Sequence, residues 1–69
     1  MKKLVLNRIK AVLAEKGRKN IELAQKLDVK DTTVSRWATN DSQPSIATLF
    51  QIAEYLDVDV RTLLVSNKN

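Results

Sequence analysis

Two short helical patterns separated by a sharp corner constrain the fold of this chain most strongly. The patterns cover residues 20–27 and 31–38, and their apolar residues recur at helical spacing: Leu23, Ala24 and Leu27 in the first, Val34 and Trp37 in the second. The residues between the patterns, centred on Asp28-Val29, are too few for anything but a tight turn. The sequence therefore predicts two short amphipathic helices packed against each other.

The second of these helices has an informative outer face. That face consists of Asp31, Thr32, Thr33, Ser35 and Arg36. A helix with a purely structural role is expected to expose mainly Glu and Lys, whereas short hydrogen-bonding side chains beside one Arg suit contact with base edges in a DNA groove. The pattern therefore favours a helix-turn-helix whose second helix reads DNA.

Each residue on this face also has a plainer interpretation, and for Ser35 this is a small packing position instead of a contact to the DNA backbone. Arg36 can pair with a phosphate or with a neighbouring carboxylate, and Thr32 or Thr33 can turn its hydroxyl back to the helix backbone. Asp31 is expected to stabilise the helix N-terminus rather than to contact a cytosine, because phosphates repel a carboxylate. Trp37 lies on the apolar face, so we expect it in the core rather than stacked on a base.

The remaining segments show helical periodicity without a sustained strand alternation, which predicts an all-α domain of five helices. We expect a first helix from about Leu4 to Lys16, with Leu6 among its inward residues, ended by a left-handed Gly17. Asn20 and Asp31 are each either the cap or the first residue of their helices. Ser45 is expected to cap a helix that reaches Leu56.

The C-terminal part of the chain carries a further start signal. Asp59 is expected to cap a fifth helix, with Val58 and Leu63 placed as a hydrophobic staple. The 69-residue chain has room for one domain, which we place at residues 1–66, followed by a frayed tail at 67–69.

Composition excludes several classes of function. The chain has no cysteine and no histidine, so we expect no disulfide, no thiolate metal site and no cofactor. Its carboxylates are scattered, which argues against an enzyme. The longest apolar run is four residues, far too short to span a membrane, so we expect no membrane association and a cytoplasmic protein.

Charge is distributed unevenly along the chain. Up to Arg36 there are ten basic residues, Lys2 and Lys3 among them, against four acidic ones, a net charge of +6. From Trp37 onward two basic residues face four acidic ones, a net charge of −2. The half with the predicted helix-turn-helix is therefore the basic half, as phosphate attraction requires. A solvated surface could show the same split by chance.

A set of motifs in this order is similar to the lambda-repressor/Cro type of helix-turn-helix, the XRE family of bacterial and phage regulators. The resemblance spans about Arg8 to Leu64 and rests on Ile9-Lys10, Glu15-Lys16-Gly17, Glu22-Leu23-Ala24, Lys26-Leu27, Val29, Thr33-Val34-Ser35-Arg36-Trp37, Pro44-Ser45, Thr48-Leu49, Ile52-Ala53, Leu56-Asp57-Val58 and Leu63-Leu64. It implies a compact five-helix domain that binds double-stranded DNA.

The chain departs from this family at three places. Relatives usually carry Gly at the corner where this chain has Asp28, which tolerates the left-handed conformation at a cost of about 1 kcal/mol or less. Many relatives pair an Arg and a Glu at the positions of Leu13 and Ala38, so we expect these two residues to lie close together as an apolar replacement. Relatives usually open the first motif helix with Ser-Gln, where this chain has Lys19-Asn20.

The resemblance also assigns roles to residues. The second motif helix inserts its N-terminus into the major groove, which implies base contacts from Asp31, Thr32, Thr33 and Arg36. Contacts to the DNA backbone are then expected from Lys19, Asn20, Lys30, Ser35, Thr39, Asn40, Ser42 and Gln43. Lys2, Lys3 and Arg8 add electrostatic attraction or simply form a solvated face.

Family members usually gain specificity by binding a near-palindrome as dimers. We therefore expect a homodimer, with some of Phe50, Tyr55, Leu64 and Val65 at its interface, and a role in transcription regulation, more as a repressor than as an activator. The alternative is a protein-interaction module with a protein partner, such as an antitoxin of the same fold.

Overall fold

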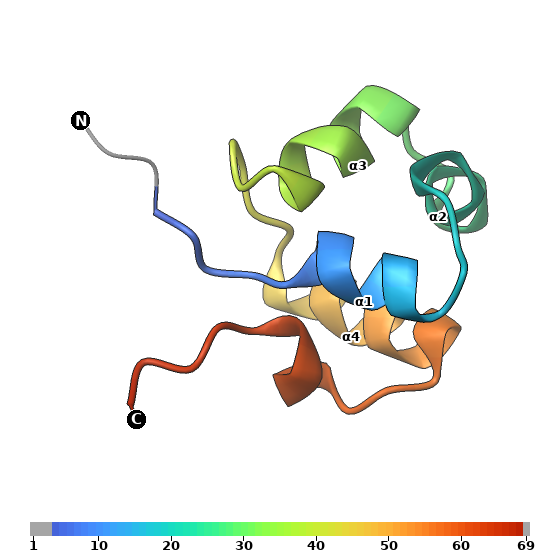
Figure 1. Cartoon of the computed structure of the whole chain (residues 1–69). Helices are drawn as coiled ribbons and strands as arrows, with labels where there is room; N and C mark the ends of the chain where they lie inside the picture. The colour runs from blue at the N-terminus through green and yellow to red at the C-terminus, as the bar shows by residue number, and fades with distance from the viewer. Residues whose placement is uncertain (1–3, 69) are drawn as a thin grey trace.

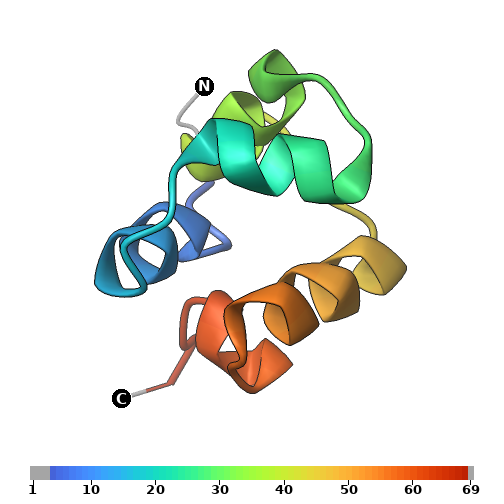
Figure 2. The same ribbon diagram turned by 90° about the vertical axis from the view of Figure 1, so that its right-hand side faces the viewer.

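Four α-helices and one 3-10 helix form the domain in the computed structural model, which describes residues 4–68. The helices are α1 (Ile9–Glu15), α2 (Asn20–Leu27), α3 (Asp31–Ala38), α4 (Ile46–Leu56) and the 3-10 helix η1 (Val60–Leu63). In Figure 1, α3 lies above α1 and α4. Figure 2 shows α1 and α4 on opposite sides beneath α2 and α3. The all-α fold class is confirmed, although the expected fifth α-helix is a four-residue 3-10 helix.

A single hydrophobic core joins these elements. The largest side chains that are fully buried come from every one of them: Ile9, Val12, Leu23, Val34, Ile52 and Leu63. Helix α4 also buries Leu49, Ala53 and Leu56, which makes it the main internal support of the domain. A domain of this size is only marginally stable without close helix packing, so most of its apolar residues at helical spacing are buried in this core.

The predicted start of the first helix is wrong. Residues 4–8 are not helical, because the backbone of this segment bonds to the C-terminal segment instead. The N–H of Arg8 donates to the carbonyl of Leu63 at 2.7 Å, and the N–H of Val65 donates to the carbonyl of Leu6 at 3.0 Å. These bonds flank an isolated antiparallel bridge between Asn7 and Leu64. Leu6, expected on the inward face, is therefore 48% exposed.

The corner between α2 and α3 has the predicted conformation. Asp28 ends α2 with a φ of 56°, in the left-handed region. The chain reverses there, and the N–H of Val29 donates to the carbonyl of Ala24 at 3.0 Å. Gly17 after α1 likewise has a φ of 66°. A residue with a Cβ is strained in this region, so Asp28 occupies a place where glycine would fit without strain.

The start signals of the later helices are confirmed. The side-chain oxygen of Ser45 accepts the N–H of Thr48 at 3.1 Å, and the carboxylate of Asp59 accepts the N–H of Arg61 at 2.8 Å. Each bond satisfies one of the backbone donors that a helix N-terminus leaves free.

The starts of α2 and α3 show whether Asn20 and Asp31 are caps or the first residues of their helices. Asn20 and Asp31 are the first helical residues, and the caps are the preceding lysines, Lys19 and Lys30. Neither lysine side chain makes a capping bond. At α2 the carboxylate of Glu22 reaches back instead and accepts the N–H of Lys19 at 2.8 Å.

The positions where relatives carry an ion pair are both buried. Leu13 is 2% exposed and belongs to the core cluster, and Ala38 is 7% exposed. Their burial agrees with an apolar replacement of the charged pair, since an unpaired charge at either place would lose its hydration. Direct contact between the two side chains stays a prediction.

The described ends of the chain lie on the same side of the domain (Figure 1). In the tail, the hydroxyl of Ser66 donates to the carbonyl of Lys68 at 2.6 Å. Two of the basic residues, Lys2 and Lys3, and Asn69 of the predicted tail lie outside the described residues. Over residues 4–68 no helix has the length and apolarity needed to cross a membrane.

Candidate nucleic-acid interface

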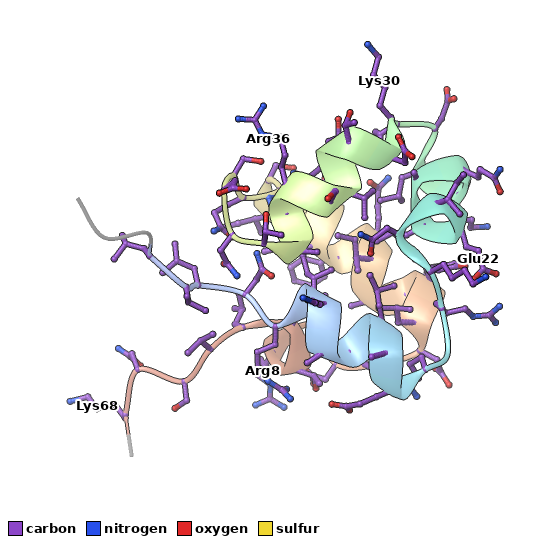
Figure 3. All side chains as sticks on the ribbon, turned by 45° about the horizontal axis from the view of Figure 1, so that its top comes forward. Arg8, Glu22, Lys30, Arg36 and Lys68 are labelled. Atoms are coloured by element: carbon purple, nitrogen blue, oxygen red, sulfur yellow. The ribbon has the colours of Figure 1, made fainter. Side chains whose placement is uncertain are left out.

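Helix α3 has one buried and one exposed face. Val34 is fully buried and Trp37 is 8% exposed, which confirms that the tryptophan belongs to the core. On the opposite face Thr32 and Arg36 are exposed. Figure 3 shows Lys30 and Arg36 extending away from α1 and α4, at the two ends of this helix. The core thus fixes α3 in place while its polar face stays open to a ligand.

The guanidinium of Arg36 is available for binding. No carboxylate of residues 4–68 lies within ion-pair distance of it; the pairs found there join Arg8 to Glu15, Arg18 to Glu22, and Arg61 to Asp59. The alternative in which Arg36 pairs with a neighbouring carboxylate is therefore not observed. A free Arg offers a planar set of donors suited to guanine or phosphate.

The hydroxyl groups on the same face are also unengaged. Within the described part of the chain, Thr32, Thr33 and Ser35 donate no side-chain hydrogen bond; the hydroxyl that bonds back to carbonyls of α3 is that of Thr39. The alternative in which Thr32 or Thr33 bonds back to the helix is therefore not observed. Thr32 and Ser35 are exposed, whereas Thr33 is half-buried. These side chains keep their hydrogen-bonding capacity for an external partner.

The N-termini of α2 and α3 each carry a basic residue. Lys19 and Lys30 are both exposed at the caps, next to backbone N–H groups that a helix leaves without internal acceptors. Asn20 follows Lys19 and is half-buried. Asp31 is exposed in the first turn of α3, where a negative charge interacts favourably with the helix dipole. This position agrees with a stabilising role for Asp31.

The loop after α3 is internally bonded rather than open. The hydroxyl of Thr39 donates to the carboxylate of Asp41 at 2.7 Å. Asn40 has a φ of 63°, and its side-chain oxygen accepts the Nε2 donor of Gln43 at 3.0 Å. Ser42 is half-buried, with its N–H directed to the carbonyl of Arg36 at 3.3 Å. These predicted DNA-backbone contacts therefore sit in a loop whose shape is fixed before any ligand arrives.

This geometry is shared with known proteins. A helix-turn-helix family model matches residues 9–63, most of the chain. The chain belongs to the lambda-repressor/Cro-type (XRE) helix-turn-helix family. No curated protein sequence matches it.

Two solved structures of similar proteins share this helix-turn-helix fold. A candidate DNA-binding protein from Bacteroides fragilis is 52% identical, with a TM-score of 0.86 over 87% of this chain and 97% of that one. A transcriptional regulator from Listeria innocua is 25% identical, with a TM-score of 0.70 over 93% of this chain and 68% of that one.

Beside this helix-turn-helix lies a residue that sequence reasoning missed. Among the described residues, Asn7 is the one polar residue that is buried, with an exposure of 3%. Its amide group donates to the side chain of Gln43 at 2.7 Å, in the loop that follows α3. The available signal was an Asn between the apolar residues Leu6 and Ile9, since Asn there suits a cap. Its distant partners could not be read from the sequence.

Apart from Ile21 and Val29, the exposed large apolar residues of the described chain form two separate groups on this helix-turn-helix domain. On α4, Ile46 is 74% exposed and Phe50 is 58% exposed, one turn apart on the same face. At the chain ends a second group, which we call the terminal aliphatic cluster, consists of Leu4, Val5, Leu6, Leu64 and Val65. Tyr55, one of the residues expected at an interface, packs partly against the core, and the centroid of its ring lies 5.7 Å from the guanidinium carbon of Arg18. Its place at an interface stays a prediction.

Proposed function

We propose that this protein is a sequence-specific, double-stranded-DNA-binding transcription regulator that reads the major groove through α3. The single observation that carries the proposal is the free polar face of a helix whose other face is locked in the core: Thr32, Thr33, Ser35 and Arg36 have no side-chain partner among residues 4–68. Membership of a family of DNA-binding regulators supports the same function. Binding of this kind is non-covalent and requires no catalytic group. We therefore propose a protein that is not an enzyme and that acts in the cytoplasm.

The proposed base contacts are Asp31, Thr32, Thr33 and Arg36. Arg36 is the strongest of them, because its exposed fork of donors can bind guanine O6 and N7 together. Asp31 is the weakest, because its place at the helix N-terminus already accounts for it. Thr33 is restricted by its partial burial, so Thr32 is the more accessible partner for a thymine methyl or a base edge.

The proposed DNA-backbone contacts surround α3. Lys19 and Lys30 are exposed cations at helix N-termini, which favours contact with phosphate. The other proposed contacts are polar and uncharged: Asn20, Ser35, Thr39, Asn40, Ser42 and Gln43. Contacts of this kind set the position of the protein on DNA more than they attract it.

We further propose that two copies bind a near-palindromic site. Half-sites one helical turn apart are separated by about 34 Å, and the domain measures 33 × 27 × 22 Å, so neighbouring copies come close to touching. A recognition helix lies along the groove, which places the second copy to the side of α3. Helix α4, with Ile46 and Phe50 exposed, lies below α3 and toward one side of the domain (Figure 2). Binding across a promoter in this way favours repression.

A protein-interaction module, such as an antitoxin, is the second candidate. The terminal aliphatic cluster favours it, because a contiguous group of exposed aliphatic side chains is typical of a surface that contacts another protein. In that case the partner would cover Leu4 and its neighbours, of which Leu4 is 70% exposed.

A salt series on random duplex DNA separates the two functions. For a DNA binder, the logarithm of the binding constant falls linearly with the logarithm of salt concentration. With Lys19, Lys30 and Arg36 as the cations at the interface, we expect a slope of about −2 to −3 per domain. A slope near zero, or no binding to the duplex at low salt, would contradict the DNA-binding function and favour the interaction module.

A further inference from the structure

Asn7 uses every polar atom of its side chain inside the protein. Its Oδ1 accepts the N–H of Ile9 at 3.0 Å, which starts α1. Its Nδ2 donates both to the carbonyl of Trp37, in the last turn of α3, at 3.0 Å and to Oε1 of Gln43 at 2.7 Å. A buried amide with all its bonds satisfied holds its neighbours in one arrangement.

The backbone of Asn7 extends this arrangement to a second loop residue. The N–H of Asn7 donates to Oδ1 of Asn40 at 3.0 Å, and Nδ2 of Asn40 donates back to the carbonyl of Asn7 at 3.3 Å. The N–H of Leu6 donates to the same Asn40 oxygen at 2.9 Å. Asn40 thus bonds to the N-terminal segment on the side that is not occupied by Leu64.

These bonds compensate for an unfavourable backbone. Asn40 has a φ of 63°, a left-handed conformation that Asn tolerates better than most residues other than glycine, but still at a steric cost. The chain leaves α3 at this residue and turns toward α4. The side chain of Asn7 adds to this support through Gln43, whose Nε2 donates to the same oxygen of Asn40 at 3.0 Å. Loss of the Asn7 amide would therefore release the last turn of α3 and weaken the support of the loop.

We propose that Asn7 is a positioning residue for DNA binding: it sets the end of α3 and the loop 39–43 in the shape that meets the phosphate backbone, without touching DNA itself. At 3% exposure Asn7 cannot contact a ligand, so its side chain acts through Gln43 and Trp37. This inference rests on the proposed function, in which the loop contacts DNA. It adds a residue that lies outside the helix-turn-helix motif.

The test compares Asn7→Asp with Asn67→Asp. Both replacements are isosteric and add the same charge, but Asn67 is exposed at the chain end. The carboxylate at position 7 keeps the acceptor for Ile9 and loses both donors, to Trp37 and to Gln43. Affinity for a duplex that the unaltered protein selects from a random pool is measured at a temperature where circular dichroism shows both variants folded. We expect Asn7→Asp to bind at least about ten-fold more weakly than Asn67→Asp.

A second readout separates positioning from general destabilisation. If Asn7 acts through Gln43, the effect of Asn7→Asp on affinity must shrink in a Gln43→Ala background, because coupled residues give non-additive effects. In the Asn7→Asp variant, faster hydrogen exchange of the Gln43 side-chain amide, whose Nε2 donates to Asn40 at 3.0 Å, would show in nuclear magnetic resonance spectra that the loop has been released.

The outcomes are distinct. Equal affinities for Asn7→Asp and Asn67→Asp, or an effect that is unchanged by Gln43→Ala, would overturn the positioning role while leaving DNA binding intact. Failure of the unaltered protein to bind any duplex would overturn the proposed function as well. If Asn7→Asp is unfolded, Asn7→Ser replaces it, since a hydroxyl can still accept from Ile9 but is too short to reach both other partners. If both variants are unfolded, Asn7 is needed for folding only, and its proposed role in positioning the loop is wrong.

Discussion

At the scale of single residues, the domain differs from its relatives where it has exchanged charge for packing. Leu13 and Ala38 are both buried at positions where many relatives carry an Arg and a Glu. A buried ion pair and a packed apolar pair can be equally stable, whereas a single buried charge is not. The two positions should therefore tolerate a joint change better than a single one.

We predict that Leu13→Arg alone lowers the free energy of unfolding by about 3–5 kcal/mol, because it buries a charge without a partner. Adding Ala38→Glu should recover part of that loss if the two side chains meet. Denaturant unfolding of the two single variants and the double variant measures the coupling. Strictly additive losses would show that Leu13 and Ala38 do not face each other.

A second prediction at this scale concerns the left-handed residues. Asp28 and Asp57 end α2 and α4 with φ values of 56° and 57°. Replacing either by Gly removes the steric cost and increases the freedom of the unfolded chain, so we expect a net change between zero and about 1 kcal/mol in favour of folding. Thermal unfolding of Asp28→Gly and Asp57→Gly should show similar effects. Clear destabilisation by Asp28→Gly alone would mean that its carboxylate has a specific role at the corner.

At the scale of elements, the helices were predictable where short-range signals and packing agree. Periodicity predicted α2 and α3 correctly, and Ser45 and Asp59 marked the starts of α4 and η1. The start of α1 was not predictable, because residues 4–8 bond to a segment more than 50 residues away in the sequence. The candidate site followed the same rule: the outer face of α3 was predicted, while the bonds of Asn7 to Asn40 and Gln43 were not.

The start of η1 gives a prediction for pH. The side-chain hydrogen bond from Arg61, with a further bond from its backbone N–H, holds the pKa of Asp59 below its ordinary value. A lowered pKa means that the carboxylate form is favoured by folding, so its stabilising effect is complete above the unfolded pKa and is lost as pH falls through the folded pKa. We expect Asp59→Asn to unfold at a lower temperature than the unaltered protein at pH 7, with the difference closing below about pH 4.

Glu54→Gln, on the exposed face of α4, is the matched control for this titration. It removes one carboxylate of the same charge that makes no ion pair with residues 4–68. A constant difference between Asp59→Asn and the unaltered protein across the whole pH range would contradict the linkage to Asp59.

At the scale of the whole molecule, the proposed regulator binds one operator as two copies. The exposed pair Ile46 and Phe50 on α4 is the proposed interface. Because Phe50 is 58% exposed, Phe50→Ser should leave the unfolding temperature nearly unchanged and reduce the formation of a two-protein complex on a palindromic duplex. Sedimentation of protein and duplex at micromolar concentration measures this stoichiometry.

Val65→Ser is the control for that experiment, because it reduces the other exposed apolar group, the terminal aliphatic cluster, by one member. Loss of the two-protein complex in Val65→Ser instead of Phe50→Ser would move the interface to the chain ends. Binding of only one protein molecule per palindromic duplex by the unaltered protein would contradict the proposed dimer.

We expect α3 to read the DNA sequence, with Arg36 as its strongest base contact. Selection of bound duplexes from a random pool, performed with the unaltered protein and with Arg36→Ala, tests this role of Arg36. Arg61→Ala, on η1, removes the same charge away from α3. We expect the unaltered protein and Arg61→Ala to select the same half-site. With Arg36→Ala, one guanine position should lose its preference, at a cost of about 1–3 kcal/mol in discrimination. Equal weakening of Arg36→Ala on all sequences, with the half-site preserved, would contradict the claim and make Arg36 a phosphate contact.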